Sequence, residues 1–130
     1  VGGEGGRHAR TFREAVQPGM TLGQVVGLAE GRWVCQGFLQ AASDAENARE
    51  ALGITAMPDG SVTLARGTER EVYRNRASVQ EKVETLPPEF GKDARYVFTF
   101  LGTTPGHWSV AVTFGPDGKA EGVTGPKFWD

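Results

Sequence analysis

Two stretches of alternating side chains constrain the fold more than any other feature of the sequence. They read RYVFTFL over residues 95–101 and HWSVAVTF over residues 107–114. Both are rich in β-branched and aromatic residues, and a period of two is typical of a strand with one buried face. The link of residues 102–106 contains Gly and Pro and has the length of a hairpin loop. The sequence therefore predicts two neighbouring antiparallel strands.

The two faces of this strand pair differ in the size of their side chains. One face is heavy enough to form the core and to be covered by helices; it carries Tyr96, Phe98, Phe100, Trp108, Val110, Val112 and Phe114. The other face is small and only mildly apolar, which suits a sheet face turned toward solvent or a partner. Small side chains cost little entropy to immobilise on binding. We therefore take this second face as the candidate binding site for a protein partner: Val97, Thr99, Leu101, Ser109, Ala111 and Thr113.

Two P-D-G turns mark further strand ends, in residues 57–61 and 115–119. Pro presets φ, Asp accepts hydrogen bonds from the turn backbone, and Gly takes a positive φ. The first turn leads into SVTLARG, residues 61–67, which reads as another strand. Together these segments predict an antiparallel sheet of four to five strands.

Three capping-box patterns, in which a hydroxyl and a later Glu or Gln satisfy free N–H groups, predict short helices. The first is T-x-x-Q at Thr21, before an apolar face that runs to a stop at Gly31. The second is S-x-x-E at Ser43, which predicts a helix over residues 43–52 ended by Gly53. The pattern indicates helices that cover one face of the sheet.

Two segments stay open between helix and strand. The third capping box, at Ser78, begins residues 78–86, which end at Pro87-Pro88 and could equally form an irregular strand. RWVCQGFL, residues 32–39, is either a strand or a continuation of the first helical region. We predict an α+β class: two or three short helices packed on one face of the sheet.

A chain of 130 residues has the size of one domain. Residues 1–10 contain four glycines and no apolar pattern, so residues 1–17 are predicted to be a flexible leader. Residues 18–130 are predicted to form a single α+β domain.

Several function classes find no support in the sequence. A net charge of −2 without a concentrated basic patch argues against nucleic acid. No segment approaches the roughly 18 apolar residues of a membrane span. One Cys and two His lack metal-ligand spacing, so we expect no metal. The sequence has no G-x-x-x-x-G-K phosphate loop and no G-x-S-x-G nucleophile elbow, and we expect no cofactor. Cys35 is interpreted as a small buried hydrophobe, and Asp117 as a turn residue.

G-M-T-x-x-x-V-x-x-L, residues 19–28, resembles the opening helix of small bacterial envelope domains related to SmpA/OmlA (BamE) and to the β-lactamase inhibitor protein. F-G-P-D-G-K, residues 114–119, is similar to the turn of their last strand pair. The chain departs from the pattern after Leu28, where Ala29 and Glu30 precede a late Gly31, and Arg32-Trp33 stands where a Pro is expected. The likeness covers well under half of the chain.

The resemblance implies a non-catalytic, exported binding module located in the periplasm or cell envelope, acting as an inhibitor, assembly factor or scaffold. It is compatible with a lipid anchor upstream of Val1. The alternative is a cone-shaped, NTF2-like ligand carrier or enzyme, which would line a pocket with Phe98, Phe100, Trp108 and His107. A third interpretation is a structural domain of a larger exported protein.

Overall fold

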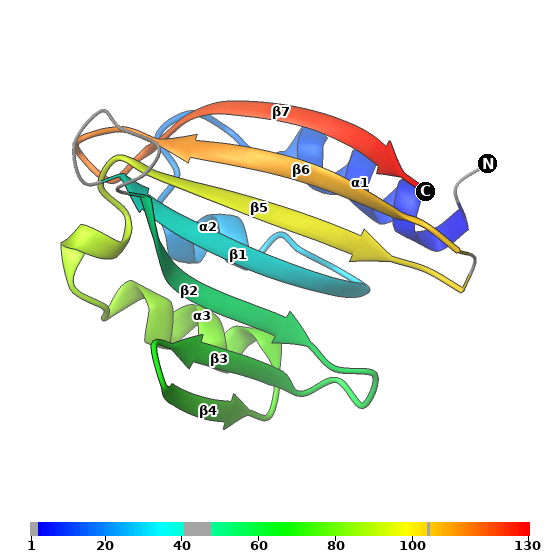
Figure 1. Ribbon diagram of the computed structural model, residues 1–130, viewed down its shortest axis with the longest axis horizontal. Helices are drawn as coiled ribbons and strands as arrows, with labels where there is room; N and C mark the ends of the chain where they lie inside the picture. The colour runs from blue at the N-terminus through cyan, green and yellow to red at the C-terminus, as the bar shows by residue number, and fades with distance from the viewer. Residues whose placement is uncertain (1–2, 41–47, 104) are drawn as a thin grey trace.

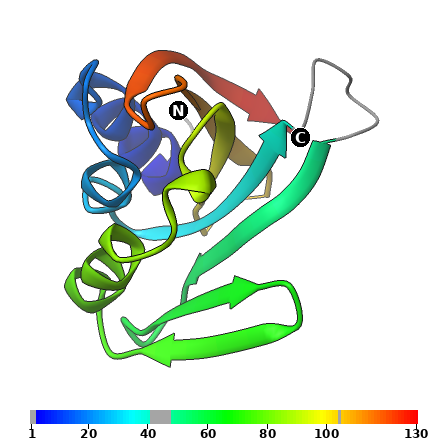
Figure 2. The ribbon, with the colours of Figure 1, turned by 90° about the vertical axis from the view of Figure 1, so that its left-hand side faces the viewer.

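The computed structural model describes residues 3–40, 48–103 and 105–130. Within them, seven strands form one antiparallel sheet, and three α-helices pack on one of its faces (Figures 1 and 2). Figure 1 looks onto the helix-free face, with the helices behind the strands. The elements are α1 (Gly3–Ala15), α2 (Leu22–Val26), β1 (Arg32–Gln40), β2 (Ala48–Ala56), β3 (Val62–Arg66), β4 (Glu69–Tyr73), α3 (Arg76–Glu84), the 3₁₀ helix η2 (Pro88–Phe90), β5 (Ala94–Leu101), β6 (His107–Phe114) and β7 (Ala120–Trp129).

The sheet has the strand order β4-β3-β2-β1-β5-β6-β7. The predicted α+β class and the antiparallel sheet are confirmed, but there are seven strands rather than four or five. Strands β5 and β6 are neighbours, paired from Arg95↔Thr113 to Leu101↔His107. Residues 32–39, which the sequence left open, belong to β1 and pair with β2 on one side and β5 on the other.

The core lies between the sheet and the helices, on the heavy face that the alternation predicts. Tyr96, Phe98 and Phe100 on β5 are fully buried, as are Val110 and Val112 on β6. The other large buried residues come from the helices and from β1 and β2; they include Phe12, Val25, Val26, Trp33, Leu52 and Ile54. The helices thus cover the aromatic side of the strand pair.

Residues 3–15 form α1, so the prediction of a flexible leader is wrong for them. Phe12 is fully buried, and its ring centroid lies 4.5 Å from that of Phe98 and 5.3 Å from that of Phe100. Gly5 lets the helix approach closely, because a Cβ there would lie 3.2 Å from the Phe100 carbonyl oxygen. Burial of Phe12 compensates for the poor helix propensity of the glycines. The grouping of residues 18–130 as a single domain stays a prediction.

Residues 48–56 form β2 and not the second helix predicted over residues 43–52. The expected capping residue Ser43 lies outside the described residues. Leu52 and Ile54 alternate with Gly53, and both are buried. Strand β2 pairs with β1 from Ala48 to Thr55, and residues 53–56 also pair with β3. This tertiary pairing outweighs the local preference for a helix.

The other two helices begin at side-chain caps. Thr21 and Gln24 form the predicted capping box, although α2 ends at Val26 instead of reaching Gly31. The cap of α3 is Asn75, whose side chain accepts a 2.9 Å hydrogen bond from the Ser78 backbone N–H. Residues 78–86 are therefore mainly helical, but the predicted Ser78 cap is wrong and the helix starts earlier.

Both predicted P-D-G turns are present. Asp59 accepts hydrogen bonds from the Ser61 hydroxyl and N–H, and these bonds lower the pKa of Asp59. Asp117 accepts from the Lys119 N–H at 3.0 Å. Gly118 follows with a φ of 76°, where glycine is favoured. The second turn joins β6 to β7 and so places β7 beside the candidate binding face.

Candidate functional site

The helix-free face of β5, β6 and β7 carries side chains in rows set by the strand register. One row joins Leu101, His107 and Trp129, and the next joins Thr99, Ser109 and Lys127. A third row joins Val97, Ala111 and Thr124, and a fourth begins with Arg95 and Thr113. Because partners across an antiparallel pair share a face, these side chains stand on the side opposite to Phe98 and Phe100.

A groove of about 550 Å³ lies on this face. Its walls combine small apolar, hydroxyl-bearing and basic side chains with one tryptophan; the lining residues are Arg95, Val97, Thr99, His107, Ser109, Ala111, Thr124, Gly125, Lys127 and Trp129. The volume falls within the range of about 300–1,000 Å³ that ligand sites occupy.

The structure brings four of the six predicted binding residues together in the groove: Val97, Thr99, Ser109 and Ala111. Ala111 is only 8% exposed and therefore lies deep in this surface. Leu101 and Thr113 share the face but do not line the groove. Whether these residues bind anything stays a prediction.

Sequence reasoning did not assign six further lining residues to this site: Arg95, His107, Thr124, Gly125, Lys127 and Trp129. Arg95 continues the alternation of β5 by one step and was within reach of the sequence pattern. Lys127 and Trp129 depend on the register of β7, which a bulge shifts, so alternation alone does not place them.

The bulge lies where Ser109 pairs with Lys127 but Ala111 pairs with Thr124, which leaves one extra residue in β7. Gly125 lies within it at a φ of 111°, and a Cβ there would approach the Ser109 carbonyl oxygen to 2.6 Å. From the helix side, the Arg13 Nε donates to the Gly125 carbonyl at 3.2 Å. Helix α1 thereby supports the edge of the groove.

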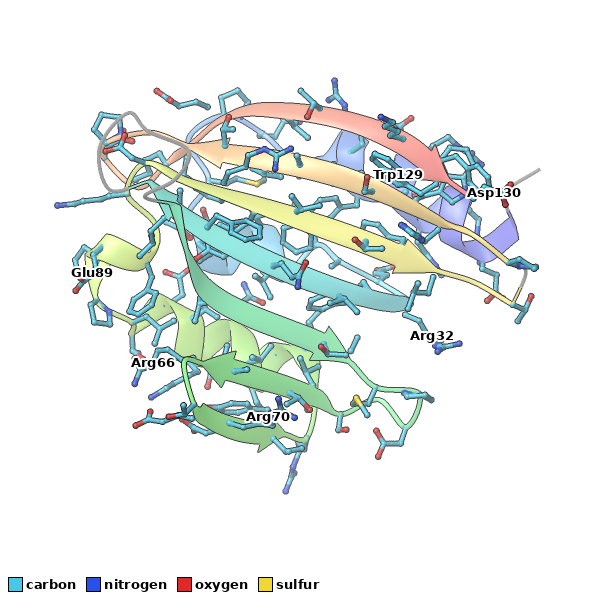
Figure 3. All side chains as sticks on the ribbon, in the orientation of Figure 1. Arg32, Arg66, Arg70, Glu89, Trp129 and Asp130 are labelled. Carbon is cyan, nitrogen blue, oxygen red and sulfur yellow. The ribbon has the colours of Figure 1, made fainter. Side chains whose placement is uncertain are left out.

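Trp129 is held at one end of the groove by two contacts. Its Nε1 donates to the Ser109 Oγ at 2.7 Å, and the Lys127 Nζ lies 4.0 Å from its ring centroid. The side chain is nevertheless 44% exposed. Figure 3 shows it at the C-terminal end of β7. A partly exposed ring fixed in position is a feature of binding-site anchors.

The charge of the groove is of one sign. Its ionisable lining residues are Arg95, His107 and Lys127, and none of the ten described lining residues is a carboxylate. Elsewhere on the same face, the register places Arg32 on β1 and Arg70 on β4, both labelled in Figure 3. The lining of the groove is thus basic, although the whole chain has a net charge of −2.

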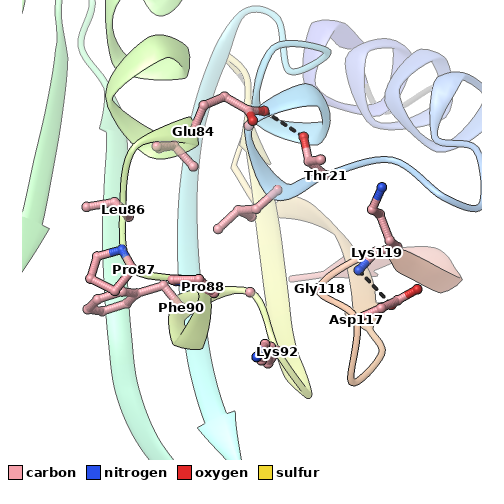
Figure 4. Close-up of a pocket in the computed structure, with 14 residues that line it drawn as sticks. Thr21, Glu84, Leu86, Pro87, Pro88, Phe90, Lys92, Asp117, Gly118 and Lys119 are labelled. Carbon is pink, nitrogen blue, oxygen red and sulfur yellow. Dashed lines mark hydrogen bonds between the residues drawn. The ribbon is translucent and has the colours of Figure 1, made fainter.

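A second hollow of about 210 Å³ lies between α2, α3, η2 and the turn that joins β6 to β7 (Figure 4). The Thr21 Oγ1 donates to the Glu84 Oε1 across it at 2.6 Å, so these two polar groups are already paired. The hollow is smaller than typical ligand sites. We therefore take the groove on the sheet face as the candidate site.

Cys35 and His107 lie on opposite faces of the sheet. Cys35 pairs with Phe98 on the helix side, whereas His107 stands on the open face. Burial raises the pKa of the Cys35 thiol, which keeps it protonated and unreactive at neutral pH. The Asp117 carboxylate accepts the Lys119 N–H hydrogen bond of the turn. Among the described residues, no group of three or more His, Cys, Asp or Glu side chains is placed to hold a metal ion.

No family model matches the chain, and neither the curated proteins nor the solved structures include a significant match to it. In the described part of the chain, none of the helices has the length and apolar character required to cross a bilayer.

Proposed function

We propose that the protein is a non-catalytic binding module that docks a protein partner on its helix-free sheet face, at the groove over β5, β6 and β7. The observation that carries this proposal is the groove itself. It lies on the face without helices, contains four residues expected to bind a partner, and has a fixed, partly exposed tryptophan at one end. A location in the periplasm or cell envelope, with or without a lipid anchor, is proposed from the sequence resemblance alone.

A small-molecule carrier is the second candidate, because the groove volume suits a small ligand. The NTF2-like version of this idea expected a pocket walled by Phe98 and Phe100. Both residues are fully buried and packed against Phe12, so they do not line a cavity here. A carrier function would therefore use the opposite face of the sheet.

Site-specific photocrosslinking tests where a partner docks. A benzophenone amino acid is placed at Thr124 in the groove, at Arg70 on the same face but on β4, and at Glu81 on α3. All three positions are exposed. We expect one discrete adduct from position 124 in cell extract, and none from the two control positions. Mass spectrometry of the adduct then identifies the partner.

The purified partner provides the decisive measurement. Thr99→Tyr fills the groove without adding charge, and Thr113→Tyr adds the same bulk on the same face outside it. We expect Thr99→Tyr to weaken binding about tenfold or more, as obstruction of a central contact does, and Thr113→Tyr to leave it nearly unchanged. Equal affinities for both folded variants would refute the docking site. A small molecule that copurifies with the parent and is lost from Thr99→Tyr would support the carrier instead.

A further inference from the structure

The groove is basic in a chain that is acidic as a whole. The sequence has 16 acidic residues against 14 Lys and Arg residues, yet the ionisable residues that line the groove are Arg95, His107 and Lys127. Overall composition does not account for this local excess of positive charge. Charged side chains across an interface are arranged so that opposite potentials meet. The groove is therefore complementary to an anionic occupant.

The basic groups are spread along the strands instead of converging on one point. Arg95 is at one end of the groove, and Leu101, the partner of His107, is six residues farther along β5. At about 3.4 Å per residue, this corresponds to about 20 Å. A single small anion cannot contact both ends. An extended peptide of about six residues spans this distance.

Lys127 is held between these ends. Its ammonium lies 4.0 Å from the Trp129 ring centroid, and that ring is fixed in turn by its hydrogen bond to Ser109. Such a contact holds the charge near the groove while leaving the side chain exposed. Thr99 and Thr124 add hydroxyl groups to the walls, and hydroxyls can donate to carboxylate or backbone oxygens.

We propose that the groove binds an extended, acidic segment of a partner protein, whose carboxylates contact Arg95 and Lys127, with His107 at the far end. This inference rests on the proposed function and specifies the chemistry of the partner. A peptide is favoured over single-stranded nucleic acid because the groove is lined by one tryptophan rather than by a series of aromatic side chains for stacking bases.

A capped heptapeptide with Glu at every second position is the probe, because alternate side chains of an extended peptide point the same way. The matched peptide carries Gln in place of Glu. Binding is measured by amide shifts in NMR and by titration at low and high salt. We expect the Glu peptide to shift amides of β5, β6 and β7 and to bind about tenfold tighter than the Gln peptide, an advantage that salt reduces.

Charge-removing variants locate the contacts. Arg95→Gln and Lys127→Gln should each weaken the Glu peptide about two- to fivefold, as expected for exposed ion pairs. Arg70→Gln removes a positive charge from the same face on β4 and should leave binding unchanged. Circular dichroism and melting confirm that each variant folds.

Four outcomes would overturn the inference: no binding of the Glu peptide, equal binding of the Gln peptide, binding of free glutamate as tight as that of the peptide, or tighter binding of a thymidine oligonucleotide. Failure of this inference can be told from failure of the proposed function. Suppose that binding of the purified partner is blocked by Thr99→Tyr and yet unchanged by Arg95→Gln, by Lys127→Gln and by salt. That result would refute the acidic segment as the ligand and would still support the docking site.

Discussion

Replacement of Phe12 by alanine tests whether the N-terminal segment belongs to the core. Phe12 is fully buried in α1, and its ring packs against Phe98 and Phe100 with centroid distances of 4.5 and 5.3 Å. The substitution removes these aromatic contacts and leaves a space above β5. It also removes the phenylalanine through which α1 packs against the aromatic side chains of β5.

The structure sets the size of the expected loss. Phe→Ala at buried sites costs about 3–5 kcal/mol in the free energy of unfolding. Helix α1 packs mainly against β5, β6 and β7 at one end of the sheet and can relax or detach, so we expect about 3 kcal/mol, near the lower limit. Gly5 and Gly6 each disfavour a helix by about 1 kcal/mol relative to Ala. Once undocked, α1 should therefore unfold locally while the sheet remains.

Urea denaturation followed by tryptophan fluorescence measures the total loss, and hydrogen exchange of residues 3–15 measures local opening. Thr11→Ala, at the neighbouring exposed position, is the control and should change stability by no more than about 0.5 kcal/mol. If Phe12→Ala were as stable as this control, and residues 3–15 of the parent exchanged like an unstructured peptide, the segment would be a leader and the assignment of α1 to the core would be refuted.

Two further predictions concern the core and a helix cap. Burial raises the pKa values of the Cys35 thiol and the Tyr96 hydroxyl, so the unfolded chain loses these protons at lower pH than the folded one. The free energy of unfolding should be at its full value below about pH 8.5 and fall above it by up to about 1.4 kcal/mol per pH unit per group. In urea unfolding of Cys35→Ala, the decline should begin nearer about pH 10, because only Tyr96 remains. The same pH dependence in Cys35→Ala and in the parent would contradict this. Asn75→Ala should lower the free energy of unfolding in urea by about 1 kcal/mol through loss of the α3 cap, whereas Ser78→Ala should lower it little. A larger loss from Ser78→Ala than from Asn75→Ala would show that Ser78 is the cap.

The sequence predicted those elements in which local preference and tertiary pairing agree. Alternation over residues 95–114 places the buried and open faces of β5 and β6 correctly, and both P-D-G turns form as expected. It failed where packing outweighs local preference. Ala, Glu and Leu favour a helix around Leu52, but pairing with β1 and β3 makes this segment a strand. The glycines of α1 disfavour a helix, but burial of Phe12 stabilises one.

The candidate site was predictable to the extent that it follows from alternation. Val97, Thr99, Ser109 and Ala111 share a face because strands have a period of two, and the structure places them in one groove. The positive charge of the groove was not predicted. Lys127 comes from β7, where the bulge changes the register and only the three-dimensional pairing brings it beside Ser109.

The position of β1 beside β5 has a consequence for how the chain folds. These central strands pair without interruption from Arg32↔Leu101 to Leu39↔Ala94, yet β2, β3, β4 and α3 all intervene in sequence. The outer pairs join segments close in the chain and can form early, whereas the central pair must first close a long loop at an entropic cost. High contact order of this kind slows folding. We therefore expect the seam between β1 and β5 to set the folding rate and to be where an exchange of strands between two chains would begin.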